Sequence, residues 1–386
     1  MPLNSRPFTV NIPQSALDDL AKRLDLVRWP EKETVDDWGQ GVPLAEAQRV
    51  VSHWRSSYDW RRCEAQLNMH DNFLAEIDGL DIHFLHIRSK HADALPMVLT
   101  HGWPGSVVEF LKVIAPLTDP EAHGGTAANA FHLVIPSLPG YGFSAKPDRN
   151  GWTVQRIAQA WDVLMKGLGY DRYIAQGGDW GSAVTTAMAL LNPASLLAIH
   201  LNMLVARPSP EQAAQPTPDE TALMERIGLW SKQGRGYSEE QSTKPQTLAY
   251  SLVDSPVGQA MWIYEKFHGW TDNGGQSPAD CFDLDEILDN IMVYWLTATG
   301  GSSARLYWES LGNWPQDKSD VPLAVSNFPH EIMPGVRRWA ENRYSRIIHW
   351  GNLDKGGHFA AFEQPTLFVS EMRAAFASLW QANRQD

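Results

Sequence analysis

The sequence predicts an α/β fold in which a mostly parallel β-sheet is flanked by helices. Short apolar runs of strand length alternate with amphipathic runs of helical length, first over residues 73–206 and again over residues 317–386. A long, mostly helical stretch interrupts the alternation between these two parts. Strands that alternate with helices are typical of parallel sheets, because the chain must cross back over the sheet between two parallel strands, and a helix usually forms this crossover. A chain of 386 residues is long enough for one large domain with such an insertion.

Composition and cysteine content limit the partners and the compartment. The 32 Lys and Arg residues against 45 Asp and Glu residues give a net charge of -13, and no basic stripe offsets it, so nucleic acid is an unfavourable partner. Cys63 and Cys281 lie outside any Cys-x-x-Cys pattern, which argues against a disulfide framework or zinc site. Residues Met1 to Arg6 lack the apolar run of a signal peptide or membrane anchor. We expect a soluble, cytoplasmic protein.

Residues 1–72 are predicted to form a helical segment on the outside of the main domain. A helix that begins at Pro13 and ends before Pro30 places four apolar residues on one face, namely Leu17, Leu20, Ala21 and Leu24. A second amphipathic helix is predicted over residues 44–58.

Residues 73–206 are predicted to form the first part of the core. Asp78-Gly79 lies between two strand-like runs, 73–77 and 80–87, and this dipeptide favours a tight hairpin turn. The remaining predicted strands are 96–100, 131–137, 172–176 and 196–202, and the predicted helices are 154–168 and 182–191.

Residues 207–316 are predicted to form a helical cap domain between the two parts of the core. Four prolines within residues 207–218 predict a linker, and a mostly helical stretch follows that includes residues 284–299. The second part of the core, residues 317–386, is predicted to contain strands 321–326 and 345–350 and a helix over 365–380.

The segment Gln-Gly-Gly-Asp-Trp-Gly at residues 176–181 joins a predicted strand to a predicted helix. Small residues two before and two after Asp179 are typical of the nucleophile elbow of the α/β-hydrolase fold, with Asp in place of the usual Ser. A carboxylate is ionised near pH 7 and can attack a saturated carbon without a base, which forms an ester of the enzyme. The alternative is an Asp that caps a helix in a glycine-rich turn. The flanking strand and helix favour the nucleophile.

Three further positions fit this fold. The loop His-Gly-Trp-Pro-Gly-Ser at residues 101–106 follows a predicted strand, so the backbone N–H groups of Trp103 and Trp180 are the predicted oxyanion-hole donors. His358 lies between the last predicted strand and the last predicted helix. In this fold the catalytic residues follow one another along the chain as nucleophile, acid and base, so the general base is expected there. Glu331, after strand 321–326, is the predicted acid that orients it, since Asp354 is too near in sequence.

If the carbon that Asp179 attacks carries an oxygen leaving group, as in an epoxide, the departing alkoxide needs a proton donor. Tyrosine hydroxyls in the predicted cap are suitable donors, and the residue pattern does not select among five candidates: Tyr237, Tyr250, Tyr264, Tyr294 and Tyr307.

At these positions the chain resembles the microsomal-type epoxide hydrolases of the α/β-hydrolase superfamily and their soluble fungal and bacterial relatives. The likeness runs nearly end to end and includes the strings at residues 58–61, 77–84, 101–106, 178–181, 243–245, 254–258 and 356–363. The resemblance implies that Tyr237 and Tyr307 are the ring-opening tyrosines, with Asp179, His358 and Glu331 as nucleophile, base and acid. It also implies that the N-terminal segment wraps around the domains. The membrane anchor of the mammalian members is missing, which suggests a soluble member.

The expected reaction is hydrolysis of a small hydrophobic epoxide to a vicinal diol, which makes the protein a hydrolase acting on ether bonds. We expect no cofactor and no metal, and a homodimer stays open beside a monomer. One alternative is a haloalkane dehalogenase, which also uses an elbow Asp followed by Trp but needs no protonating tyrosines. Another is a binding protein that kept the fold without catalysis. Which epoxide is the substrate is left open.

Overall fold

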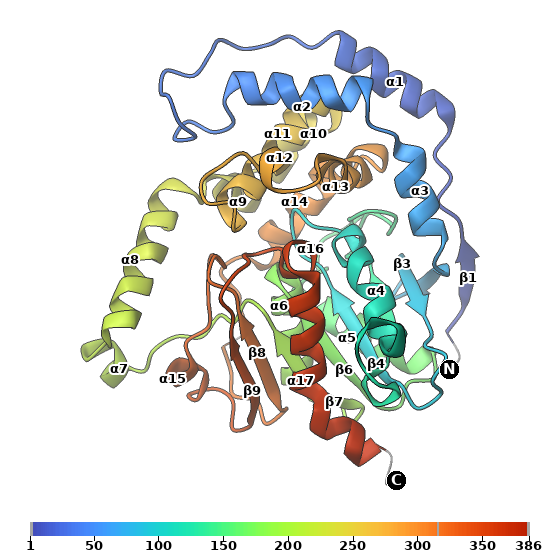
Figure 1. Ribbon diagram of the computed structural model, residues 1–386, viewed down its shortest axis with the longest axis vertical. Coiled ribbons are helices and arrows are strands. Elements are labelled where there is room, and N and C mark those ends of the chain that lie inside the picture. Colours follow the sequence, from blue (N-terminus) through green and yellow to red (C-terminus); the bar gives the residue numbers. More distant parts are fainter. Residues whose placement is uncertain (1–2, 315, 384–386) are drawn as a thin grey trace.

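A nine-stranded sheet forms the centre of the computed structural model, which describes residues 3–314 and 316–383 (Figure 1). The strand order is β1-β2-β3-β5-β4-β6-β7-β8-β9. The first three strands and β5 pair antiparallel, and β5, β4, β6, β7, β8 and β9 pair parallel. The strands are β1 Ser5–Phe8, β2 Asn72–Ile77, β3 Leu80–Ile87, β4 Leu95–Thr100, β5 Phe131–Pro136, β6 Tyr173–Gly177, β7 Leu196–Leu201, β8 Leu323–Asn327 and β9 Ile347–Asn352. The predicted α/β-hydrolase fold class is confirmed.

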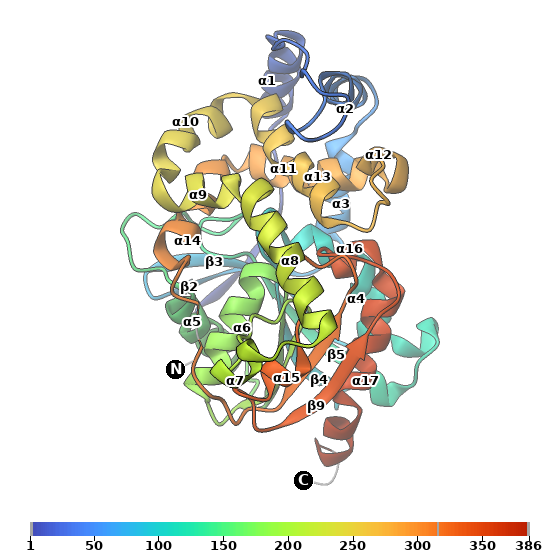
Figure 2. The same cartoon turned by 90° about the vertical axis from the view of Figure 1, so that its left-hand side faces the viewer.

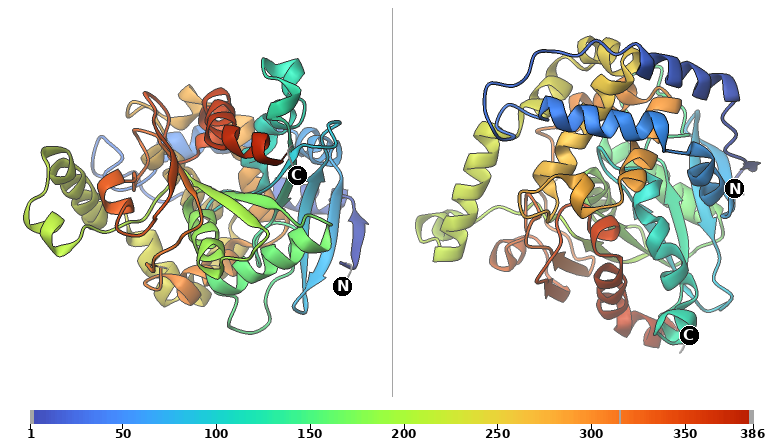
Figure 3. Two further views of the ribbon diagram at one scale, coloured as in Figure 1. Left: turned by 90° about the horizontal axis from the view of Figure 1, so that it is seen from below. Right: turned by 45° about the horizontal axis from the view of Figure 1, so that its top comes forward.

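Helices cover both faces of the sheet, as the view from below shows (Figure 3). On one face lie α4 (Leu111–Thr118) and α17 (Pro365–Asn383), and on the other lie α5 (Val154–Gly167) and α6 (Asp179–Leu191). Every residue of β4, β5 and β6 is therefore buried, which explains their nearly continuous apolar sequences. Short helical turns complete the core: η1 Val107–Phe110, η2 Pro120–His123, η3 Ala127–Asn129, α15 Arg337–Ala340 and α16 Ala360–Glu363.

Eight helices between β7 and β8 are here called the cap helices. They are α7 Pro210–Ala214, α8 Pro218–Gln233, α9 Gly236–Thr243, α10 Pro245–Asp254, α11 Pro256–Trp270, α12 Pro278–Cys281, α13 Leu284–Leu296 and α14 Gly300–Ser310. Helices α9 to α14 lie above the sheet, whereas α8 runs down beside it to α7, which lies next to α15 (Figures 1 and 2). The prediction of a plain linker over residues 207–218 is wrong, because α7 lies within it and α8 begins at its end. Ser209 and Thr217 form capping boxes, and the following prolines occupy first-turn positions where a missing N–H is tolerated.

The N-terminal helices α1 (Gln14–Asp25), α2 (Leu44–Ser56) and α3 (Trp60–Asn68) rest against the cap helices (Figure 1). Polar contacts join this segment to helix α13: Tyr58 donates to Asp289 at 2.8 Å and Arg62 pairs with the same carboxylate at 2.8 Å. No helix within the described residues is both long enough and apolar enough to cross a membrane.

Candidate active site

Asp179 lies at the sharp turn between β6 and α6. Its φ of 49° is in the left-handed region, which is strained for a residue with a side chain. The turn closes tightly: a Cβ on Gly177 would collide with the carbonyl of Gly181, and a Cβ on Gly181 would collide with the carbonyl of Thr100. Glycine is required at both positions, which is the steric reason for the motif seen in the sequence.

The Asp179 carboxylate faces the loop that follows β4. Its Oδ1 accepts a hydrogen bond from the backbone N–H of Trp103 at 2.8 Å. A Cβ on Gly102 would collide with the same carboxylate, so this loop approaches as closely as it does because residue 102 is glycine. Trp180 is the second residue of α6; donation from its N–H to a reacting oxygen stays a prediction.

His358 and Glu331 lie beside Asp179, on the loops that follow β9 and β8. His358 Nε2 is 3.3 Å from Asp179 Oδ2, and His358 Nδ1 is 2.9 Å from Glu331 Oε1. A backbone hydrogen bond of 3.0 Å from His330 N–H to the Gly356 carbonyl joins the two loops. The side chain of Glu331 is fully buried, whereas Asp354 is exposed.

The electrostatics of His358 follow from its two acidic neighbours. Burial acts to lower its pKa, but the charges and hydrogen bonds of Glu331 and Asp179 outweigh burial, and the pKa of His358 lies well above its ordinary value. His358 is therefore an imidazolium between two carboxylates when Asp179 is ionised.

Tyr237 on α9 and Tyr307 on α14 face the same region from the cap side. The ring of Trp103 stacks on Tyr237 with centroids 5.0 Å apart and meets Tyr307 edge-on at 5.8 Å. Both tyrosines are buried. Burial and the charge of Asp179 raise the pKa of Tyr237, and burial, Tyr237 and Asp179 raise that of Tyr307, in each case well above the ordinary value. Both hydroxyls therefore keep their protons at neutral pH.

Of the other three candidate tyrosines, one is exposed to solvent and two donate hydrogen bonds to other groups. Tyr250 is 72% exposed. The Tyr264 hydroxyl donates to Glu46 at 2.6 Å, on the N-terminal segment. The Tyr294 hydroxyl donates to the Gly105 carbonyl at 2.7 Å. Of the five candidates, Tyr237 and Tyr307 pack against Trp103, the residue whose backbone N–H contacts Asp179. Their role as proton donors stays a prediction.

Helix α13 holds the loop that carries the Trp103 N–H, a role that the sequence did not indicate. Asn290 Nδ2 donates to the Pro104 carbonyl at 2.7 Å, next to the Tyr294 bond to Gly105. Both side chains are buried on an otherwise apolar helix face. Polar residues among buried apolar positions were the available signal, but the sequence does not show which carbonyls they reach.

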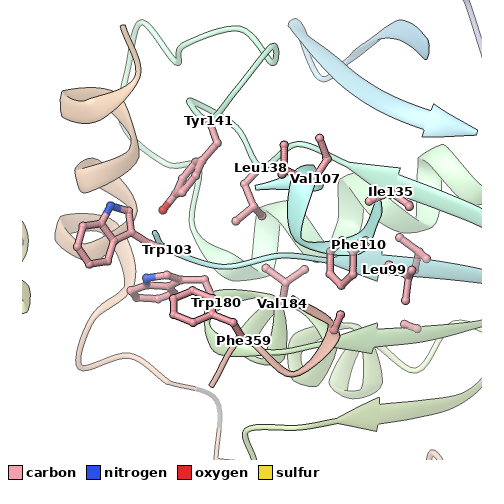
Figure 4. Close-up of a cluster of buried hydrophobic side chains, with 14 of the residues drawn as sticks. Leu99, Trp103, Val107, Phe110, Ile135, Leu138, Tyr141, Trp180, Val184 and Phe359 are labelled. Carbon is pink, nitrogen blue, oxygen red and sulfur yellow. The ribbon is translucent and has the colours of Figure 1, made fainter. Parts of the chain in front are cut away.

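The surroundings of the site are aromatic and apolar. The buried cluster that includes Leu99 and Val184 extends from the sheet to Trp103, Trp180 and Phe359 at the carboxyl ends of the strands (Figure 4). Apolar walls with a few convergent polar groups are typical of small-molecule sites.

One group of side chains could in principle ligate a metal within residues 3–314 and 316–383, namely His91, Asp119 and Glu121. It lies at the other end of the sheet from Asp179, before β4 begins. Lys90 Nζ already pairs with Asp119 at 2.8 Å and with Glu121 at 3.3 Å.

Comparison with known proteins decides the family. Residues 5–110 match the model of the epoxide hydrolase N terminus, and residues 96–248 match that of the alpha/beta hydrolase fold. A protein of Stigmatella aurantiaca named "Putative epoxide hydrolase" is 56% identical over 97% of this chain and 85% of that protein. Epoxide hydrolase 1 of Sus scrofa is 34% identical over 97% of this chain and 89% of that protein. The chain belongs to the epoxide hydrolase family.

Solved epoxide hydrolases share the whole architecture. The epoxide hydrolase of Aspergillus niger superimposes with a TM-score of 0.87 at 32% identity, over 98% of this chain and 97% of that one. The juvenile hormone epoxide hydrolase of Bombyx mori gives a TM-score of 0.90 at 28% identity, over 98% and 96%. The N-terminal segment, the core and the cap helices of this epoxide hydrolase are therefore all part of the family architecture.

Proposed function

We propose that this epoxide hydrolase converts an epoxide to a vicinal diol in two steps, through an ester on Asp179. The observation that carries the proposal is the contact of one carboxylate, Asp179, with both a backbone N–H donor and the His358–Glu331 pair. A carboxylate nucleophile needs the donor and the base for the second step, in which its own ester is hydrolysed.

In the first step, an oxygen of Asp179 attacks an epoxide carbon and the C–O bond to the ring oxygen breaks. Tyr237 or Tyr307 gives its proton to the departing oxygen, which becomes the first hydroxyl of the product. Each phenol carries a proton to give at neutral pH, which general acid catalysis requires. A halide leaves without a proton, so a pair of buried phenols favours an epoxide over a haloalkane.

Before the second step, the imidazolium of His358 releases its proton to solvent, because the ester has removed the charge of Asp179. The neutral ring then removes a proton from water, and the resulting hydroxide attacks Cγ of the Asp179 ester. Hydrogen bonds from the backbone N–H groups of Trp103 and Trp180 stabilise the oxyanion. The intermediate collapses, and the departing alkoxide takes its proton from His358 to become the second hydroxyl. The new carboxyl of Asp179 loses its remaining proton, which restores the tyrosine, and His358 takes a proton back from solvent beside the restored carboxylate. The net reaction is epoxide plus water to diol.

The function is tested with styrene oxide, bulkier aryl epoxides and a panel of haloalkanes, by chiral chromatography of the diols and by halide release. We expect diol from at least one epoxide and no halide from any haloalkane. In a single turnover in oxygen-18 water, the label should enter the Asp179 carboxylate. Halide release without any diol would identify a dehalogenase, and the absence of both products would favour the non-catalytic alternative.

A further inference from the structure

A small cavity lies against the Asp179 carboxylate. Polar groups line it on several sides, among them Glu109, Gln176, Asn202 and His358. The space open to the centre of a water molecule is about 20 Å³. One buried water needs roughly 10–15 Å³ by that measure, together with two to four polar partners. The cavity therefore has the size for one water and is too small for an organic substrate.

Glu109 is the acid in this cavity that the two-step scheme does not use. It belongs to η1, which follows the loop that carries Trp103, and its carboxyl packs over Gly105. A Cβ on Gly105 would lie 2.5 Å from Glu109 Oε2, so the carboxyl reaches this position because residue 105 is glycine. Burial raises the pKa of Glu109 to about 8, with Asp179 acting in the same direction and His358 in the opposite one. At neutral pH the carboxyl is mostly uncharged and does not compete with His358 as a base.

Gln176 adds a second polar group on the wall of the cavity. Its side chain is 1% exposed, and its Nε2 donates to Asn202 Oδ1 at 2.8 Å. Its Oε1 is buried, and no donor reaches it within the described residues. A buried carbonyl oxygen without a donor is unfavourable by about 1–3 kcal/mol unless water satisfies it. Because Gln176 lines the cavity, a water there is a suitable donor for this oxygen.

We infer that this cavity binds the water that hydrolyses the Asp179 ester, and that Glu109 positions that water for attack. The inference rests on the proposed two-step function. One hydrogen of the water points to His358 Nε2 and the other to a carboxyl oxygen of Glu109, which directs an oxygen lone pair towards Cγ of Asp179. In the step itself, the O–H bond to His358 breaks and the C–O bond to Cγ forms, while the Glu109 hydrogen bond holds the attacking oxygen in place.

Glu109→Leu and Glu109→Gln separate this role from a structural one, because the amide keeps an acceptor oxygen and leucine does not. Single-turnover rates of ester formation and ester hydrolysis are measured with styrene oxide for each variant. In Glu109→Leu, hydrolysis should slow roughly 100-fold while ester formation stays within about threefold. The values of kcat and KM should then fall together, with kcat/KM nearly unchanged. Glu109→Gln should lose no more than about tenfold in hydrolysis. Glu225→Leu, at an exposed acid on α8, is the matched control and should leave both rates unchanged.

Unchanged ester hydrolysis in Glu109→Leu, or equal slowing of both steps, would overturn the inference and leave the two-step scheme intact. If no ester forms in the wild-type enzyme or in His358→Gln, the proposed function fails, and the inference with it. A high-resolution crystal structure of the wild-type enzyme gives a second test that needs no variant to fold. It should show a water within about 3.2 Å of both Glu109 and His358 Nε2, and a cavity without such a water would overturn the inference.

Discussion

His358 Nε2 lies 3.3 Å from Asp179 Oδ2, so the proposed base is paired with the nucleophile whose ester it later hydrolyses. This pairing helps to raise the pKa of His358 well above its ordinary value. In the proposed mechanism, forming the ester removes the negative charge of Asp179. The pKa of His358 then falls, because one of its two acidic partners has become neutral. The first step thereby favours the uncharged imidazole that the second step needs.

Replacing the cap tyrosines should slow ring opening. Tyr237→Phe and Tyr307→Phe each remove one proton donor, and we expect each to lower the single-turnover rate of ester formation roughly 10- to 100-fold. The double variant should lose more than either single variant. Tyr250→Phe is the control, because Tyr250 is 72% exposed, and its rate should match that of the wild type. Ester formation at the wild-type rate in the double variant would show that the proton comes from another group.

The bond from Tyr294 to the Gly105 carbonyl should matter for both stability and catalysis. Tyr294→Phe leaves a buried carbonyl without its donor, and we expect the free energy of unfolding to fall by about 1–3 kcal/mol in urea denaturation. Ester hydrolysis should also slow, because the neighbouring Trp103 N–H is less firmly held. Tyr264→Phe should lower stability without this kinetic effect, because its partner Glu46 lies on the N-terminal segment. Equal kinetic effects in the two variants would contradict a specific role of Tyr294.

Glycines at the elbow and in α8 should respond in opposite ways to alanine. Gly181→Ala would place a methyl group against the Thr100 carbonyl, and we expect it to destabilise the fold by about 1–3 kcal/mol or more and to abolish activity. A Cβ on Gly228, in the middle of α8, would meet no atom within 4 Å. Gly228→Ala should therefore stabilise the protein by about 0.5–1 kcal/mol through helix propensity. Thermal denaturation of the two variants checks both signs.

Acid should destabilise the protein through its buried histidines. Burial lowers the pKa of His200 to about 3; His349 acts in the same direction and Glu371 in the opposite one. As the pH falls below about 6.5, the unfolded chain binds a proton at His200 that the folded chain does not, so stability decreases as the pH falls. In His200→Gln the loss between pH 7 and pH 5 should be smaller by about 2 kcal/mol, because this titration is removed. Parallel urea-denaturation series at both pH values measure it, and identical slopes would contradict the assignment.

Much of the fold could be predicted from the sequence, because its strands and helices alternate with clear periods. The β2–β3 hairpin, the parallel strands and the long helices of the core follow from apolar spacing and turn residues. Strand β1 could not be predicted in this way, because it is an edge strand with mostly exposed side chains and a proline at residue 7. In residues 207–218 the four prolines predict a linker, but Ser209 and Thr217 carry capping-box signals that start helices there.

The site was predictable where a motif lies on one turn and less so where the fold brings distant side chains together. The spacing of the glycines around residue 179 predicts Asp179 as the nucleophile. The places of His358 and Glu331 after the last two predicted strands predict them as base and acid. The residue pattern alone could not choose among the five tyrosines, since burial and hydrogen bonding distinguish them. Glu109 and Asn290 could not be predicted, because the role proposed for Glu109 depends on a cavity and the contact of Asn290 on a backbone carbonyl far away in sequence.

The central claim is that the reaction passes through an ester on Asp179, and trapping that ester in His358→Gln tests it most directly. The variant keeps the nucleophile and the tyrosines but lacks the base, so the ester should form and accumulate. After incubation with styrene oxide, intact-protein mass spectrometry should show the addition of one substrate molecule, and peptide mapping should place it on Asp179. Asp179→Asn with the same substrate should show no initial addition. A variant that gains no mass, or gains it at another residue, would contradict the account.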